Sequence, residues 1–189
     1  MGLFAMEHGK AAYRADFALY ATAVVALTVF LCAAGPHSLR LESLVSVCAG
    51  LVSWTAIEYF LHRFVLHGMA PFKHWHEAHH QRPRALICAP TVLSASLILV
   101  LIFLPVLALG GIWIACALTL GMLTGYLLYA ITHHATHHWP AESAWLRRRK
   151  RWHALHHHDA GRLGGFGVTS GFWDHVFGSA MSGEAGPAK

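Results

Sequence analysis

Long uninterrupted apolar stretches constrain this chain more than any other feature of its sequence. A helix rises about 1.5 Å per residue, so about 18 to 25 apolar residues can cross a hydrocarbon core of roughly 30 Å. Four stretches come close to this length, and we expect an all-α integral membrane protein with about four transmembrane helices. The expected spans cover residues 17–34, 44–67, 85–109 and 112–132.

Two of these spans carry features that interrupt a simple helix. The purely apolar part of the second is short and is followed at once by Glu58. The third contains Pro90 and Pro105, so both a kinked span and a re-entrant hairpin are compatible with it. The composition supports a membrane protein, with 56% hydrophobic residues, 12% charged residues and a mean hydropathy of +0.45.

The distribution of positive charge predicts the orientation. Lysines and arginines precede the first span, lie between the second and third, and follow the fourth, whereas the opposite loops hold only Arg40. The positive-inside rule then places both termini on the cytosolic face, in a bacterial inner membrane or an endoplasmic reticulum. Of the 17 histidines, fifteen fall between His62 and His175, in segments that this orientation places on the cytosolic side.

The domain organisation is expected to be simple, because the sequence has no internal repeat. We expect a single membrane-embedded domain over residues 1–178, a cytosolic helical cap over 133–178 and a flexible tail over 179–189. The basic run at residues 147–151 lies between Trp145 and Trp152, a mixture typical of contact with anionic lipid headgroups. Docking of an acidic electron-donor protein is an alternative for this run, and no nucleic-acid partner is expected.

Closely spaced histidines recur in four places. In three of the groups the separations are three and four residues, which puts the side chains on one face of a helix. In the first group two histidines are five residues apart and align only if the helix ends or bulges between them. The candidate metal ligands are His62, His67, His76, His79, His80, His133, His137, His153, His156 and His157, and His158 is an alternative to His157.

Ten imidazoles exceed the needs of simpler metal proteins. The segment HEAHH formally matches the zinc protease motif, with His76 and His80 as ligands and Glu77 as base. That reading leaves His79 and three other histidine groups without a role. A metal transporter would need ionisable residues deep in its spans, and these spans are almost entirely apolar. A single metal takes three or four protein ligands, so ten indicate two metal ions.

The ligand type limits the chemistry without naming the metal. Imidazole suits iron, copper, nickel and zinc. Two redox-active irons at a membrane surface could activate oxygen and oxidise a C–H bond of a lipid, which acid–base chemistry alone cannot attack. The neutral imidazoles add no negative charge to the metals.

Four motifs carry a resemblance to a known family. They are EYFLHRFVLH at 58–67, HEAHHQRP at 76–83, GYLLYAITHHATHH at 125–138 and KRWHALHHHDAGRLGGFGVTSGFWDHVFG at 150–178. Their order and content resemble the histidine boxes of the fatty acid hydroxylase and sterol desaturase superfamily. The sequence is most similar to its fatty acid 2-hydroxylase branch, through EYxxHRFxxH and FGVTSxxWDxxFG, over residues 54–178.

This resemblance implies a membrane-bound non-heme di-iron oxygenase that hydroxylates a long acyl chain, in a fatty acid or a complex lipid, possibly at C2. The ten histidines named above occupy the family's ligand positions and would hold two iron ions, which zinc could replace in purified protein. Oxygen is a co-substrate, and the electrons would come from an external cytochrome b5, ferredoxin or reductase, because these 189 residues hold no heme-binding segment. Carotenoid ring hydroxylation, in the same superfamily, is the second candidate reaction.

Other residues are candidates to support the metals or the substrate. Four carboxylates could orient the N–H groups of the ligand rings: Glu58, Glu77, Asp159 and Asp174. Three aromatic residues could line the substrate entry or close over the metals: Tyr126, Tyr129 and Phe166.

Overall fold

The computed structural model describes residues 7–158 and 164–181, and its regular elements there are all helical. The long elements are α1 (Lys10–Ala34), α2 (Arg40–Phe60) and α5 (Leu104–His138), and the shorter ones are η1 (His37–Leu39), η2 (Leu61–Leu66), α3 (Phe72–Gln81), α4 (Thr91–Ile98), η3 (Leu99–Phe103), α6 (Ala144–His158) and α7 (Phe172–Val176). The all-helical prediction is confirmed for the described part of the chain.

The chain divides into two compact units, each built from separate stretches of sequence. The first comprises Met1–Trp54 and Ala85–Leu128, and the second comprises Thr55–Arg84 and Tyr129–Lys189. Helices α2 and α5 each contribute residues to both units. In the second unit, Ser179 is buried and bonded to Asp174.

Three helical stretches are long and apolar enough to cross a membrane: Lys10–Ala34, His37–Leu66 and Thr91–His138. Large apolar side chains on them point away from the protein, including Val25 (61% exposed), Leu41 (71%) and Leu101 (62%). Exposed apolar side chains on long apolar helices are what a lipid environment requires. The first helix begins seven residues before the predicted span, at Lys10.

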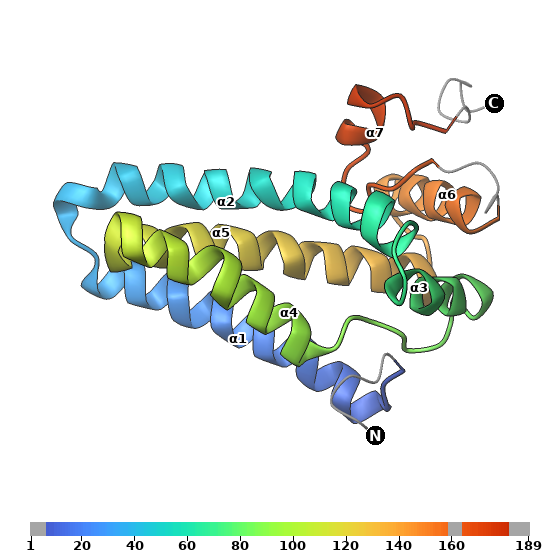
Figure 1. Ribbon diagram of the computed structural model, residues 1–189, viewed down its shortest axis with the longest axis horizontal. Helices are drawn as coiled ribbons and strands as arrows, with labels where there is room; N and C mark the ends of the chain where they lie inside the picture. The colour runs from blue at the N-terminus through green and yellow to red at the C-terminus, as the bar shows by residue number, and fades with distance from the viewer. Residues whose placement is uncertain (1–6, 159–163, 182–189) are drawn as a thin grey trace. The chain divides into compact units, whose positions relative to one another are not determined.

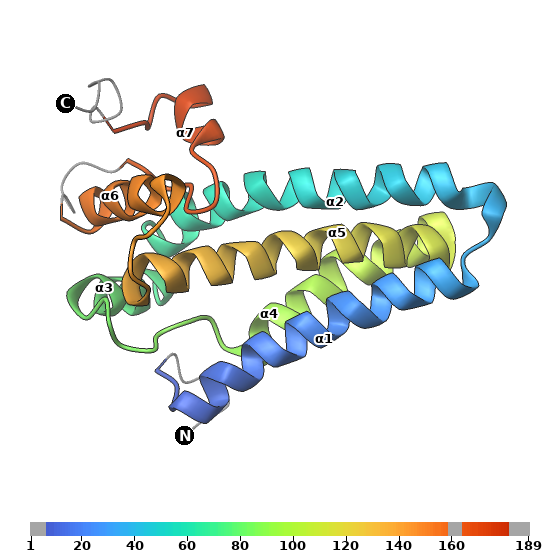
Figure 2. The same ribbon diagram turned by 180° about the vertical axis from the view of Figure 1, so that it is seen from behind.

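Most of the predicted third span and all of the predicted fourth fall within one of these stretches, Thr91–His138. Its 48 residues would form a straight helix of roughly 70 Å, more than twice the hydrocarbon thickness. Gly111 interrupts it with φ 75° and ψ 177°, a conformation that only glycine adopts at low cost. Figures 1 and 2 show the chain reversing direction there, so that α4 and most of the first-unit part of α5 run antiparallel.

The residues before Thr91 are not helical, although the third span was predicted from residue 85. Pro90 directly precedes α4 with φ −58° and ψ 130°, and α4 starts after it. Pro105 has no N–H to donate to the carbonyl of Leu101. The chain forms the π-helical turn η3 just before it, closed by a bond from the Leu104 amide to the Leu99 carbonyl.

Glycines allow close packing of α2 against α5 in the first unit. A Cβ on Gly121 would meet the carbonyl oxygen of Val47, and one on Gly125 would come within 2.6 Å of the Trp54 side chain. Gly121 and Gly125 form a GxxxG pattern, the spacing that lets membrane helices approach closely. Tyr126, on the same helix, packs edge-on against Trp54, with ring centroids 5.2 Å apart.

Helix α1 joins α4 through polar groups in the first unit. Thr91 Oγ1 donates to Asp16 Oδ1 at 2.6 Å, and the Tyr20 hydroxyl lies 2.7 Å from Ser94 Oγ. These bonds satisfy the buried side chains of Asp16 and Tyr20. Hydrogen bonding of this kind compensates part of the desolvation of buried polar groups.

Candidate metal centre

All ten candidate histidines lie in the second unit, where they form two groups of five. In each group the five nearest ligand nitrogens lie within 4.8 Å of one another. We call them centre 1 and centre 2. Centre 1 consists of His62, His67, His76, His80 and His156, and centre 2 consists of His79, His133, His137, His153 and His157. His157 rather than His158 therefore completes the second group.

Helix α3 supplies histidines to both centres. His76 and His80 are four residues apart and share a face, which turns them toward centre 1. Their Nε2 atoms lie 3.0 Å apart. His79 points to centre 2, where its ring centroid lies 4.7 Å from that of His133. The segment that formally matches a protease motif is thus divided between the two histidine groups.

The π-helical turn η2 aligns the two histidines that are five residues apart. The His67 amide donates to the His62 carbonyl at 3.2 Å, which is the i to i+5 bond of a π-helix. In such a turn, residues five apart lie one above the other, and the two ring centroids are 5.1 Å apart. The helix therefore bulges between His62 and His67, which is one of the two ways in which histidines five residues apart could align. π-Bulges of this kind occur frequently at functional sites.

The ends of α5 and α6 build most of centre 2. His133 and His137 are one turn apart on α5, and His153 and His157 are one turn apart on α6. The Nε2 atom of His153 lies 2.8 Å from Nε2 of His137 and 3.1 Å from Nε2 of His157. His156, on a neighbouring face of α6, belongs to centre 1, so α6 also serves both centres.

Backbone carbonyls hold two rings of centre 1 in a defined tautomer. His62 Nδ1 lies 2.6 Å from the carbonyl oxygen of Phe166, and His156 Nδ1 lies 2.8 Å from that of Gly164. A carbonyl can only accept, so each Nδ1 must carry the proton and donate. The Nε2 lone pairs are then free to bind a cation. Gly165, with φ 70°, makes the turn between the two carbonyls.

The buried carboxylate of Asp174 fixes this loop. It is fully buried and accepts hydrogen bonds from the amides of Phe166 at 2.9 Å and Gly167 at 2.8 Å. It also accepts one from the Ser179 hydroxyl at 2.8 Å. Asp174 was expected to contact a ligand ring, and it instead acts through the backbone between residues 164 and 167.

Glu58 anchors the next residues of the same segment. Its carboxylate accepts from the Thr169 amide at 2.8 Å and from the Thr169 hydroxyl at 2.6 Å. Sequence reasoning had not assigned a role to Thr169, the carbonyl of Gly164 or Ser179. The run FGVTS was a recognisable motif, but side-chain spacing does not show which backbone carbonyls will face a ring.

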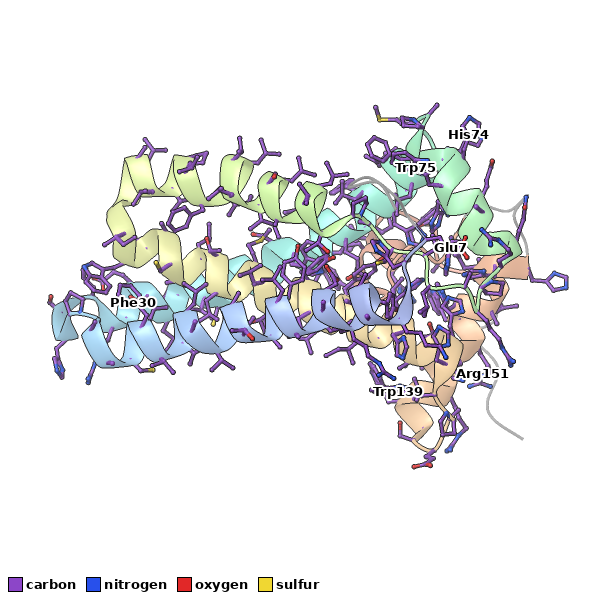
Figure 3. All side chains as sticks on the ribbon, turned by 90° about the horizontal axis from the view of Figure 1, so that it is seen from below. Glu7, Phe30, His74, Trp75, Trp139 and Arg151 are labelled. Atoms are coloured by element: carbon purple, nitrogen blue, oxygen red, sulfur yellow. The ribbon has the colours of Figure 1, made fainter. Side chains whose placement is uncertain are left out.

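The remaining predicted residues lie in different surroundings. Glu77 is half-exposed on α3, beside Lys73 at 3.8 Å and His74 at 3.6 Å, and Figure 3 shows His74 on the outer side of that helix. Tyr126 lies in the first unit, against Trp54. Asp159 falls outside the described residues.

Two aromatic side chains pack directly on the centres. Tyr129 stacks on His133 with ring centroids 5.8 Å apart and planes within 13°. Phe166 is 1% exposed and lies against centre 1, with centroid distances of 5.7 Å to His62, 5.6 Å to His67 and 5.7 Å to His156. Phe166 therefore packs against three of the five rings of centre 1.

Burial and mutual repulsion keep the imidazoles neutral. Burial, with the charges of neighbouring histidines, lowers the pKa of His67 and of His157 to about 4. The same causes lower the pKa of His79 to about 3 and that of His80 to about 2. Neutral imidazoles offer lone pairs at physiological pH, which is the state that binds metals.

The donor set fits bound cations. Among the described residues, neither ring nitrogen of His79 has a hydrogen-bond partner although both are buried, and a buried polar atom without a partner is costly. At centre 1, Nε2 of His76 is approached by Nε2 of His62 at 2.9 Å and of His80 at 3.0 Å. Ring nitrogens this close need a proton shared between them or a cation held among them. A protease base is absent from this set, because Glu77 faces outward.

Comparison with known proteins identifies similar sequences. The sequence model of the fatty acid hydroxylase family matches residues 47–179. Dihydroceramide fatty acyl 2-hydroxylase FAH2 of Arabidopsis thaliana is 34% identical over 144 residues, covering 70% of this chain and 59% of that protein. Ceramide very long chain fatty acid hydroxylase SCS7 of Saccharomyces cerevisiae is 35% identical over 151 residues, covering 73% of this chain and 38% of that protein.

A solved structure has a similar fold. The structure described as full-length scs7p, with only its hydroxylase domain visible, superposes with a TM-score of 0.78 at 29% identity, covering 97% of this chain and 71% of that chain. The two curated relatives above are considerably longer, since this chain spans 59% and 38% of their lengths.

Proposed function

Because this chain belongs to the fatty acid hydroxylase family, we propose that it is a membrane-bound oxygenase that hydroxylates a long lipid acyl chain. One oxygen atom enters a C–H bond of the acyl chain, and the other is reduced to water by two external electrons and two protons. The relatives named as 2-hydroxylases favour the carbon next to the carbonyl. A fatty acid and a ceramide-linked acyl group are both compatible substrates.

The observation that carries this proposal is the pair of five-histidine centres in one unit. Ten neutral nitrogen donors could hold two metal ions, and a structural zinc site needs only four. We assign iron to both centres. When bound, the irons supply the redox chemistry that an unactivated C–H bond requires.

The protein's own residues position and protect the site. The carbonyls of Phe166 and Gly164 hold the rings of His62 and His156 with their Nε2 atoms toward centre 1. Phe166 packs against three rings of that centre and would limit the access of water to it. Tyr129, stacked on His133, is our candidate to contact the acyl chain beside centre 2.

We further propose the membrane arrangement. The reversal at Gly111 would divide Thr91–His138 into two crossings, giving four in total. Both units would then form one enzyme, with the termini and the cap on the cytosolic face of an inner membrane or endoplasmic reticulum. The excess of positive charge in the connecting segments supports this orientation.

The test is expression in a host whose lipids lack hydroxylated acyl chains, followed by lipid mass spectrometry and elemental analysis of the purified protein. We expect a new acyl species heavier by one oxygen atom, and two irons per chain. Fragmentation of the acyl chain would locate the hydroxyl group, with C2 expected.

Two controls separate this function from its alternatives. His156→Ala should abolish the product, whereas Glu77→Gln should retain it, because Glu77 faces outward. Loss of the product in Glu77→Gln with a single zinc per chain would instead support proteolysis. If the lipids of a carotenoid-producing host are unchanged but its carotenoid is hydroxylated, the substrate is a carotenoid and not an acyl chain.

A further inference from the structure

The second unit carries a strongly cationic surface that the proposed metal centres do not explain. Its exposed carboxylates, among the described residues, are those of Glu77 and Glu142, and Glu77 lies beside Lys73. Its exposed basic side chains are more numerous: Lys73, Arg82, Arg84, Arg147, Arg148 and Arg151. Such an imbalance attracts acidic partners over long range.

Part of this charge borders centre 2. On α6, Lys150 lies three and seven residues before His153 and His157, on the same helical stripe. Arg147 and Arg151 are one turn apart and form a second stripe on α6. This second stripe lies next to Lys150, on the side of the helix that faces away from its buried residues. Figure 3 shows Arg151 extending from α6. The stripe of α6 that carries His153 and His157 therefore continues at Lys150, and Arg147 and Arg151 lie beside it.

A residue from another segment joins this row. The charges of Arg84 and Lys150 both act on the imidazole of His138, and Lys150 also acts on His137, a ligand of centre 2. We call the surface formed by Arg84, Lys150 and Arg151 the cationic border. Its members come from two segments that are far apart in sequence, and Lys150 shares a helical stripe with two histidines of centre 2.

Centre 1 is more covered in the described structure, and the basic residue next to its cover, Arg63, is bonded to the Tyr59 hydroxyl. Phe166 lies across His62, His67 and His156, and the loop that carries it is held by Asp174. The nearby Lys73 has Glu77 at 3.8 Å, which reduces its attraction for an acidic protein. The two centres therefore differ in their access to a charged partner.

We propose that the cationic border is the docking surface for an acidic electron-donor protein, which delivers electrons to the metals through centre 2. This inference rests on the proposed function, since a hydroxylation that consumes oxygen needs two electrons per turnover from outside. A one-electron donor must dock twice in each cycle, so a charge-steered, rapidly reversible encounter suits it. The anionic carboxylates of the donor would face the three basic side chains.

The test measures donor binding directly, without substrate or turnover. The protein is placed in nanodiscs of phosphatidylcholine alone, and the probes are the soluble haem domain of cytochrome b5 and a [2Fe–2S] ferredoxin. The variant combines Arg84→Glu, Lys150→Glu and Arg151→Glu. We expect its Kd for the donor to rise about tenfold or more, with a weaker dependence on ionic strength.

Matched variants keep the result interpretable. Lys73→Glu also reverses an exposed positive charge but lies beside centre 1, so it should change the Kd by less than about twofold. If the three glutamate substitutions lower the metal content, a variant with glutamine at the same three positions is measured in place of the glutamate variant. It should raise the Kd in the same direction at full metal content.

Several outcomes would overturn the docking surface. These are an unchanged Kd in the metal-loaded triple variant, an equal effect of Lys73→Glu, and failure of both donors to bind the wild-type protein at low salt. The measurement is also repeated in nanodiscs that contain phosphatidylserine. If the triple variant binds the donors as the wild type does in phosphatidylcholine and differs from it only when phosphatidylserine is present, the charges contact lipid headgroups and not a donor protein. If the donors bind in a charge-dependent way but the expression test yields no hydroxylated lipid, the docking surface is supported and the proposed reaction is refuted.

Discussion

The Asp174 carboxylate and the His62 imidazole are linked through one residue. Asp174 Oδ1 accepts from the Phe166 amide at 2.9 Å, and the Phe166 carbonyl lies 2.6 Å from His62 Nδ1. The carboxylate thus orients a metal-facing ring through the backbone and not by touching it. A direct carboxylate contact would raise the basicity of the ring more strongly. The arrangement fixes the geometry of the ring while leaving both of its nitrogens out of contact with the carboxylate.

Replacing Asp174 with Asn should loosen centre 1. One carboxylate oxygen becomes an NH2 group that faces a backbone donor, Phe166 N–H or Gly167 N–H, and leaves it unsatisfied. We expect a loss of about 1–3 kcal/mol of stability and a reduced metal content. Thermal unfolding and elemental analysis measure the two effects. Glu77→Gln is the matched control, and wild-type metal content with an unchanged melting temperature in Asp174→Asn would contradict the proposed role.

Single ligand replacements should separate the two centres. His79→Ala removes a ligand from centre 2 and His67→Ala one from centre 1, so each should lower the metal content from two ions per chain toward about one. His134→Ala is the control, because His134 stacks on His138 and belongs to neither centre. Elemental mass spectrometry on membrane-inserted protein provides the measurement. Full metal content in either ligand variant would remove that residue from the ligand set.

Much of this site was predictable because it depends on helical spacing. Histidines three and four apart on helices face one way, so the sequence indicated which residues converge. It could not divide them between centres. His76 and His79 share a helix but face different partners, and the partners are set by tertiary packing. The alignment of His62 with His67 also depends on a π-helical turn. The five-residue spacing did not decide whether the helix would end or bulge there.

The supporting contacts were less accessible to sequence reasoning. Carboxylates were expected at the ring N–H groups, but the described structure places the carbonyls of Gly164 and Phe166 there. Every residue has a carbonyl, so no residue type marks this role. Glu77 was ambiguous for a similar reason, since a charged residue beside two ligands can face inward or outward. The apolar spans were predicted because lipid exposure leaves a compositional signal, whereas their ends depended on Pro90 and Gly111.

Acid should destabilise the metal-free protein. The pKa of His67 and of His157 falls from 6.5 to about 4 on folding. The unfolded chain therefore binds protons below pH 6.5 that the folded chain does not, so stability falls as the pH drops from 6.5 toward about 4. Thermal unfolding of chelator-treated protein in detergent across this range measures the effect. A melting temperature that stays constant over this range would contradict it.

Helix packing in the first unit should be sensitive to small additions. A Cβ on Gly121 would overlap the Val47 carbonyl, a backbone atom that cannot rotate away. We expect Gly121→Ala to cost about 1–3 kcal/mol, because overpacking forces the backbones of α2 and α5 apart. Gly9→Ala is the control, since no atom lies within 4 Å of the Cβ it adds. Thermal unfolding in one detergent compares the variants, and equal melting temperatures for both would mean that the two helices can separate without loss.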